Sequence, residues 1–321
     1  MNGQRVLWGV FWGLFLLLLG ACGRGGGSIP SPAKVTATAA PTRTPTNTAS
    51  PTVTPSPTPL PLAARVNGEP ILLAEWEAEV QRLGQATETL GVDWDSLTLQ
   101  REALKSLIVE TLLAQGAEEA GYHPSIHEVQ SRYAALVEEV GGEAALQARL
   151  RALGYPDTEA FLQALQRAMA AAWMREHIAE QVPQEVEHVQ ARQILLYTEQ
   201  EAQTVYARLQ QGADFVSLAR LYDPETWGYL GWMPRKVWPT QEMEEVIFSL
   251  KPGTFSPVLS SPLGYHIVYV IARESRPLAP WAHRLWVQDA LETWIQEVWS
   301  RSDIEVLLPL EVSVQGVSHG P

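Results

Sequence analysis

The stretch that decides the fold begins with Val189-Gln190-Ala191-Arg192-Gln193-Ile194-Leu195-Leu196 and ends with Gly264-Tyr265-His266-Ile267-Val268-Tyr269-Val270. Both runs are rich in β-branched and other apolar residues, which is typical of strands. Between them, Thr198 precedes a helical period and Glu201 stands three residues later, in the pattern of a capping box. A second helix is expected to start at Asp214. The stretch therefore predicts two strands with helices between them.

Shorter pieces inside this stretch follow one another in a fixed order. They are Gly212-Ala213-Asp214-Phe215, Leu218-Ala219, Leu230-Gly231-Trp232 and Leu250-Lys251-Pro252-Gly253. Together with the two flanking strands, the series resembles the rotamase domain of parvulin-type (PpiC-like) peptidyl-prolyl cis-trans isomerases. Each piece alone is weak, but the whole series in order is specific. The resemblance implies an α+β fold over residues 187–276, with a small antiparallel sheet flanked by helices.

The resemblance also implies a set of catalytic residues. Parvulins use two histidines and a Cys or Asp, and the histidine of the last strand is present as His266. Gln193 stands where the first strand carries the other histidine, and Asp223 is the nearest residue to the Cys or Asp position. Because a glutamine can donate and accept hydrogen bonds but cannot titrate, we expect Gln193 to preserve part of a network with His266.

Substrate-binding residues are implied in the same way. The methionine of the family's proline pocket corresponds to Val237 or Trp238, and the phenylalanine to Met243, with Phe248 behind them. Trp232, from the Leu-Gly-Trp piece, is a further candidate.

Several of these residues have a structural alternative. His266 could be a buried, hydrogen-bonded residue that orders the sheet, and Asp223 could be a turn residue before Pro224. Trp238 and Met243 could pack in the core, although aromatic and methionine side chains are also adaptable contact surfaces.

The part of the chain before this stretch is predicted to be mainly helical. The run Arg65 to Ile71 reads as a strand with a turn at Asn67-Gly68. Apolar periods separated by glycine stop signals then predict successive helices. Their expected ranges are 73–90, 97–120, 125–140, 143–153 and 157–181.

The part after the stretch predicts one long helix from Pro280 to Arg301 with a broad, tryptophan-rich apolar face. This face is expected to pack on the earlier helices, and the alternative is an exposed binding surface. Ile304 to Leu308 reads as a strand that could pair with the one at Arg65 to Ile71. The helical domain would then be built from both ends of the chain, with the parvulin-like domain inserted.

The predicted division is a signal peptide at 1–22, a linker at 23–62, a helical chaperone-like domain at 63–186, the rotamase domain at 187–276 and a completing segment at 277–321. This order, with the strand Val66 to Pro70, is similar to the exported foldases of the SurA and PrsA type.

The amino terminus predicts export. The apolar run Val6 to Leu19 would span roughly 21 Å as a helix, less than the ~30 Å hydrocarbon core, which favours a secretory signal. Leu19-Gly20-Ala21-Cys22 resembles the lipobox of bacterial lipoproteins, which implies lipidation of Cys22. The alternative is an ordinary signal with a chance cysteine. Because Cys22 is the only cysteine, no internal disulfide can form.

Residues 23–62 are dominated by Pro, Thr, Ser and Ala, which predicts a disordered, partly polyproline linker that holds the folded part away from the membrane. The net charge of −13 argues against nucleic acid as a partner, because phosphate binding needs a basic face. No convincing metal-ligand spacing occurs around His123, His127 or His177, and no cofactor is expected.

Two functions fit these features. The first is a prolyl isomerase that assists the folding of exported polypeptides containing Xaa-Pro bonds, lipid-anchored at the outer face of the cytoplasmic membrane. The second is a non-catalytic holdase with a degenerate parvulin domain that binds extended chains. Gln193 and the short loop around Asp223 favour the holdase, whereas the intact Gly-Tyr-His-Ile and Leu-Gly-Trp pieces favour the isomerase.

Overall fold

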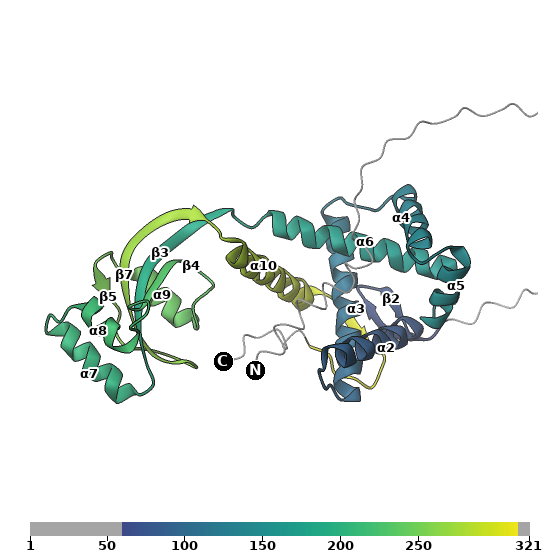
Figure 1. Cartoon of the computed structure of the whole chain (residues 1–321). Helices are drawn as coiled ribbons and strands as arrows, with labels where there is room; N and C mark the ends of the chain where they lie inside the picture. The colour runs from purple at the N-terminus through teal and green to yellow at the C-terminus, as the bar shows by residue number, and fades with distance from the viewer. Residues whose placement is uncertain (1–59, 314–321) are drawn as a thin grey trace, which may run out of the picture.

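The computed structural model describes residues 60–313, which form two lobes. The helical lobe comprises residues 60–184 and 278–313, and the sheet lobe comprises residues 185–277. Figure 1 shows the two lobes side by side, with α10 (Pro280–Arg301) between them. The signal sequence, Cys22 and nearly all of the predicted linker lie outside the described residues.

The helical lobe contains the predicted helices, with ends close to those expected. They are α2 (Leu73–Leu90), α3 (Ser96–Glu119), α4 (Ile126–Glu139), α5 (Glu143–Ala152) and α6 (Thr158–Glu180). Short polar side chains begin three of them: Asp95, Ser125 and Asp157 each accept a hydrogen bond from a first-turn backbone N–H. Such caps satisfy backbone donors that have no partner within the helix.

A small sheet closes the helical lobe and joins both ends of the described chain. The predicted strand around Asn67-Gly68 is a hairpin of β1 (Leu62–Val66) and β2 (Glu69–Leu72). Asn67 and Gly68 have φ values of 52° and 86°, the left-handed conformation that a tight hairpin turn requires. On its other side β1 pairs with β8 (Ile304–Val306), so the predicted pairing of these distant segments is confirmed.

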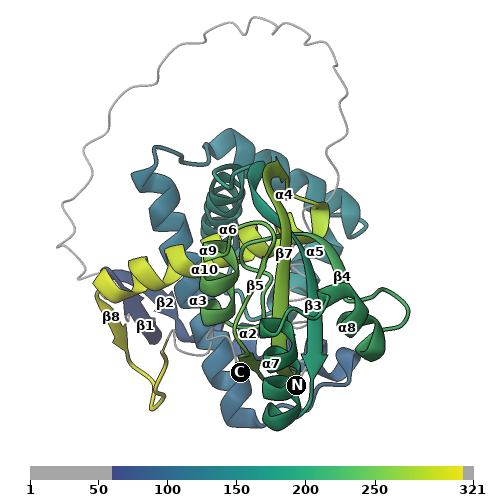
Figure 2. The same cartoon turned by 90° about the vertical axis from the view of Figure 1, so that its left-hand side faces the viewer.

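The helix α10 packs on the helical lobe through its second half. Leu291 and Ile295 contribute to one buried cluster with α3 and α6, and Val298 contributes to another with β1 and α3. Its first half keeps Trp281 and Leu285 exposed. Figure 1 shows α10 running from the helical lobe toward the sheet lobe, and Figure 2 shows β8 beside one end of α10.

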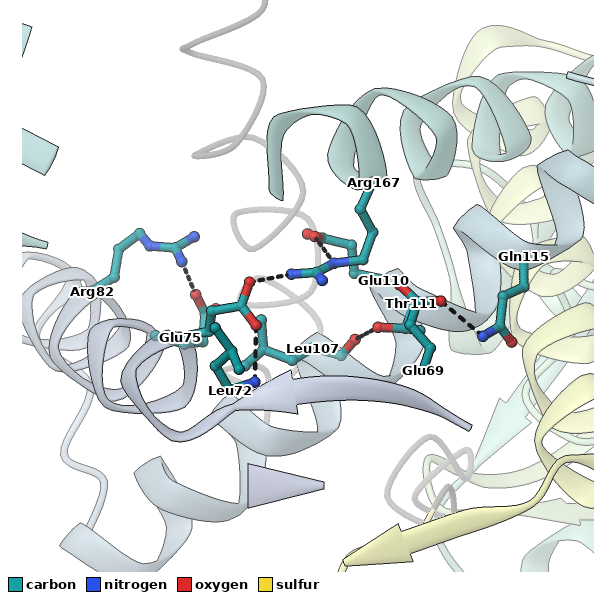
Figure 3. A network of polar contacts seen from close by, with 10 residues as sticks. Glu69, Leu72, Glu75, Arg82, Leu107, Glu110, Thr111, Gln115 and Arg167 are labelled. Carbon is teal, nitrogen blue, oxygen red and sulfur yellow. Dashed lines mark hydrogen bonds and ion pairs between the residues drawn. The ribbon is translucent and has the colours of Figure 1, made fainter. Parts of the chain in front are cut away.

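A buried polar network ties the helices of this lobe together, as Figure 3 shows. The guanidinium of Arg167 on α6 lies 2.7 Å from Glu75 Oε1 of α2 and 3.4 Å from Glu110 Oε1 of α3. Glu75 also accepts the backbone N–H of Leu72 at 3.0 Å. Because Arg167 contacts carboxylates of two other helices, the network fixes the mutual positions of α2, α3 and α6.

The sheet lobe is an antiparallel sheet in the order β4-β3-β7-β5, with β6 also paired to β7. Its strands are β3 (Glu185–Leu196), β4 (Tyr229–Pro234), β5 (Thr254–Phe255), β6 (Leu259–Ser261) and β7 (Gly264–Pro277). β3 and β7 are longer than predicted and stay paired out to Glu185 and Pro277. They form the arm that reaches the helical lobe in Figure 1.

Helices cover both faces of this sheet. α7 (Glu199–Gln210) and α8 (Phe215–Tyr222) pack on the face that presents Ile194, Leu196 and Ile267. α9 (Gln241–Ser249) packs on the opposite face, with Ala191, Val268 and Val270. The predicted fold class, a helical region combined with a small antiparallel sheet flanked by helices, is confirmed.

Candidate functional site

His266 and Gln193 lie on the sheet face that α9 covers. Side chains alternate along a strand, so His266 shares its face with Val268, and Gln193 shares its face with Ala191. In the register of β3 and β7, Gln193 is opposite Val268 and His266 is opposite Leu195. The two polar residues are therefore diagonal neighbours on adjacent strands.

The imidazole of His266 is held from both sides. Its Nδ1 lies 3.2 Å from Gln193 Oε1, and its Nε2 lies 2.7 Å from the hydroxyl oxygen of Ser261. Ser261 Oγ also accepts the backbone N–H of Leu263 at 3.0 Å. His266 is only 2% exposed, so these contacts replace its hydration.

These contacts fix the protonation of the ring. An amide oxygen can only accept, so His266 Nδ1 carries the proton, and the Ser261 hydroxyl donates to Nε2. Burial lowers the pKa of His266 below its usual value of 6.5, because the charged form loses hydration. His266 is therefore a neutral donor–acceptor at pH 7. The amide NH2 of Gln193 takes no part in these contacts.

A tight loop fixes the backbone of Gln193. Gln193 N–H donates to the carbonyl of Gly228 at 2.8 Å. Gly228 has φ +70°, and a Cβ placed on it would stand 2.0 Å from the carbonyl oxygen of Gln193. Only glycine permits both this conformation and this close approach. The loop that contains Gly228 thus supports the backbone of β3 at Gln193.

Asp223 organises the same loop and makes no contact with His266 among the hydrogen bonds described. Its carboxylate accepts the backbone N–H groups of Glu225, Thr226 and Gly228 at 3.2, 3.0 and 3.1 Å, and also the hydroxyl of Thr226. These hydrogen bonds, first those from Thr226, lower the pKa of Asp223. Asp223 is therefore connected to Gln193 through the backbone of Gly228.

The predicted pocket residues are differently exposed. Met243 and Phe248, on α9, are 1% and 5% exposed and belong to the core beneath the site. Trp238 is partly buried against that core, and Val237 is half-buried in the preceding loop. The structure thus gives a ligand little access to Met243 and Phe248, and more to Val237 and Trp238.

Trp232 lies on β4, at the edge of the sheet. The guanidinium of Arg276 lies over the Trp232 ring, 4.6 Å from its centroid. In the register it is opposite Gln190, three residues along β3 from Gln193. The structure therefore brings together Gln193 and His266, links Asp223 to them through a loop, and places Trp232 further along the edge.

The sequence analysis missed Ser261. The β6–β7 hairpin pairs Ser261 with Gly264, which turns its side chain onto His266. A serine five residues before the histidine, followed by the turn residues Pro262 and Leu263, was the available signal.

No cluster of metal-ligating side chains is present in residues 60–313, and no helix in that range is long and apolar enough to cross a membrane.

Two family models match parts of the chain. Residues 177–272 match the PPIC-type PPIASE domain, and residues 47–175 match the SurA-like N-terminal domain. The chain therefore contains one region similar to a PPIC-type PPIase domain and, before it, one region similar to a SurA-like N-terminal domain. The resemblance to parvulin-type isomerases and SurA/PrsA-type foldases that the sequence suggested is confirmed at this level.

Relatives named foldase protein PrsA and chaperone SurA also match the chain. The chain is 28% identical over 231 residues to a foldase protein PrsA from Caldanaerobacter subterraneus, covering 64% of this chain and 72% of that protein. It is 37% identical over 94 residues to a PrsA from Geobacillus kaustophilus, covering 27% of this chain and 33% of the relative. It is 30% identical over 115 residues to a chaperone SurA from Nitrosospira multiformis, covering 32% of this chain and 26% of the relative.

Among the solved structures that the chain matches is the PrsA peptidylprolyl isomerase from Bacillus cereus. The match has a TM-score of 0.44 at 20% identity and covers 73% of this chain and 87% of that one.

Proposed function

We propose that the chain is a peptidyl-prolyl cis-trans isomerase that assists the folding of exported polypeptides. The observation that carries this proposal is the buried, neutral His266 held between Gln193 and Ser261, inside a PPIC-type PPIase domain. Relatives named foldase PrsA and chaperone SurA support the same class of function.

The reaction needs positioning more than covalent chemistry. Rotation about an Xaa-Pro bond faces a barrier of ~20 kcal/mol from amide resonance. A catalyst lowers it by binding the twisted amide better than either planar form. Neutral His266 donates a hydrogen bond from its Nδ1–H to Gln193 Oε1 and so holds the glutamine in one orientation. The free NH2 of Gln193 is then available to hydrogen-bond the peptide carbonyl as its resonance is lost.

The apolar side of the site would hold the proline ring. Val237 and Trp238 are the accessible members of the predicted pocket, and Met243 and Phe248 support them from beneath. We propose that Trp232 contacts the residues of the bound peptide that flank the proline, because Trp232 lies on the edge strand β4. Asp223 acts through the loop that supports Gln193 and does not touch the peptide.

A protease-coupled assay with a proline peptide tests the isomerase directly. The full chain should accelerate the slow cis-to-trans phase, and the acceleration should fall in a Trp238→Ala variant. Identical slow phases with and without the chain would refute isomerase activity.

A holdase is the second candidate, and the observation that favours it is Gln193 in place of a titratable histidine. Delayed aggregation of an unfolded client by a chain without isomerase activity would establish this function instead. An active chain with no effect on aggregation would exclude it.

We further propose that the chain works outside the cytoplasm, anchored by a lipid on Cys22 to the outer face of the cytoplasmic membrane. The lipobox-like Leu19-Gly20-Ala21-Cys22 supports this placement. Residues 23–62 would serve as the tether, and unfolded chains emerging from the membrane would be the clients. Membrane fractionation of wild type and Cys22→Ser is the test: the variant should leave the membrane fraction, and equal retention of both would contradict the anchor.

A further inference from the structure

The two lobes touch at a loop of the sheet lobe that lies between β4 and α9. The indole Nε1–H of Trp286, on α10, donates to the carbonyl of Arg235 at 3.0 Å. The ammonium of Lys236 pairs with Asp289 and lies 4.8 Å from the centroid of the Trp286 ring. Trp286 and Asp289 are three residues apart, so they share one face of α10. One turn of α10 thus contacts two consecutive loop residues, Arg235 and Lys236.

The same two loop residues are also held by α9. The guanidinium of Arg235 lies 4.1 Å from the centroid of the Phe248 ring and 3.6 Å from Glu244 Oε1. The backbone N–H of Lys236 donates to Glu244. Lys236 has φ +66°, a conformation that residues other than glycine adopt rarely. The surrounding contacts must therefore hold the loop in its shape.

The loop leads directly into the proposed proline pocket, because Val237 and Trp238 follow Lys236. The indole Nε1 of Trp238 is buried and has no hydrogen-bond partner among residues 60–313. Trp238 therefore does not fix its own position by a polar contact, and the loop before it depends on α9 and α10 for its placement.

The helix α10 belongs to the helical lobe by its packing, since Leu291, Ile295 and Val298 are buried there. We propose that Trp286 and Asp289 are positioning residues, through which the helical lobe sets the place of the pocket loop of the sheet lobe. This inference rests on the proposed function only in assigning Val237 and Trp238 to the pocket.

The test compares Trp286→Phe and Asp289→Asn in the full chain. Phenylalanine keeps an aromatic face for Lys236 but removes the indole donor, and asparagine keeps an acceptor but removes the charge. Trp281→Phe is the matched control, because Trp281 lies on the same helix and is 43% exposed. Hydrogen exchange of the backbone amides of residues 235–238 and 240 and the kinetics on a proline peptide are measured together, with the amides of α7 as a control for folding.

Loss of the indole hydrogen bond in Trp286→Phe, or of the ion pair with Lys236 in Asp289→Asn, should raise exchange of the loop amides by about two- to tenfold and leave α7 unchanged. KM for the peptide should rise by a similar factor with kcat little altered, because the loop contributes equally to binding the ground state and the transition state of the peptide. Trp281→Phe should behave as wild type. If one variant also raises hydrogen exchange in α7, the inference is judged on the other variant.

Unchanged loop exchange in both variants would overturn the inference, whatever the isomerase activity. Faster exchange with unchanged KM would overturn the positioning role. If the wild type lacks isomerase activity, the proposed function fails separately, and the Kd for the same peptide replaces KM. The same rise in Kd would then support the inference, and an unchanged Kd would overturn it.

Discussion

His266 Nδ1 lies 3.2 Å from Gln193 Oε1, across the two central strands of the sheet. The contact orients both side chains without any charge. The glutamine thus replaces a titratable partner with one that can only hydrogen-bond, and the site keeps its connection while losing a possible proton carrier.

Removing the acceptor on Gln193 should damage this arrangement. In Gln193→Leu, the buried N–H of His266 has no acceptor, which should cost about 1–3 kcal/mol of stability. We expect kcat/KM to fall about tenfold, which corresponds to about 1.4 kcal/mol on the barrier. Gln190→Leu, on the same strand, is the control, because Gln190 bonds only the hydroxyl of Tyr229. Equal losses in both variants would contradict the role of Gln193.

Restoring a histidine tests the opposite change. In Gln193→His, an imidazole nitrogen can accept a hydrogen bond from the Nδ1–H of His266, as the amide oxygen does. We expect kcat/KM to rise, as measured in the protease-coupled assay. If it does not rise, the absent histidine does not limit the reaction.

His266 should make stability depend on pH. Its pKa is lowered in the folded chain by burial, so between 6.5 and that lower pKa the unfolded chain binds more protons. The contribution of His266 to the free energy of unfolding should therefore be at its maximum above pH 6.5. It should fall as the pH drops through this window. Denaturant unfolding of wild type and His266→Gln at several pH values measures the difference. His127→Gln, an exposed site, is the control, and a pH-independent difference for His266→Gln would contradict the prediction.

Gly228 should be irreplaceable, whereas a nearby glycine should not. Alanine at 228 adds a clash with the carbonyl oxygen of Gln193 to the cost of a left-handed conformation. Gly231 has φ +77° but open space around its Cβ position, so Gly231→Ala should cost only about 1–2 kcal/mol. Gly228→Ala should cost clearly more and also lower activity. Chemical denaturation of the two variants tests this, and equal costs would show that the close approach to Gln193 is unimportant.

Glu79, on α2, should destabilise the helical lobe at neutral pH. It is 5% exposed, and desolvation raises its pKa above 4.5, with Arg82 opposing this shift and Glu110 adding to it. Between 4.5 and the raised pKa the folded chain binds more protons, so stability falls as the pH rises through this window.

The neutral variant Glu79→Gln should therefore be more stable than wild type at pH 7, and the gain should disappear toward pH 4. Thermal unfolding at both pH values measures it, with the exposed Glu77→Gln as the control. A less stable Glu79→Gln at pH 7 would mean that the ion pair with Arg82 outweighs the cost of burial.

Much of the fold could be predicted because local signals agree with the final packing. Gly121, Gly141 and Gly154 mark helix ends, and Asn67-Gly68 marks a tight turn. The extra length of β3 and β7 could not be predicted, because their outer ends are mostly polar, and residues 185–187 of β3 pair with β7 alone. That both ends of the chain build the helical lobe was predicted from one apolar pattern, at Ile304 to Leu308, and β8 lies within this range.

The candidate site could be predicted only in part. The pairing of Gln193 with His266 followed from a family pattern, whereas Ser261 depends on the geometry of the β6–β7 hairpin. The burial of Met243 and the contact of Trp286 with Arg235 arise from packing between segments distant in sequence, which residue patterns do not encode.

The most direct test of the central claim is the rate of cis–trans exchange at one Xaa-Pro bond, measured by NMR with catalytic amounts of the full chain. We expect exchange to accelerate with wild type, to accelerate less with Gln193→Leu, and to be unaffected by Gln190→Leu relative to wild type. An exchange rate equal to that of the peptide alone, for a wild-type chain that is folded by the same spectra, would contradict the claim that Gln193 and His266 form an isomerase site.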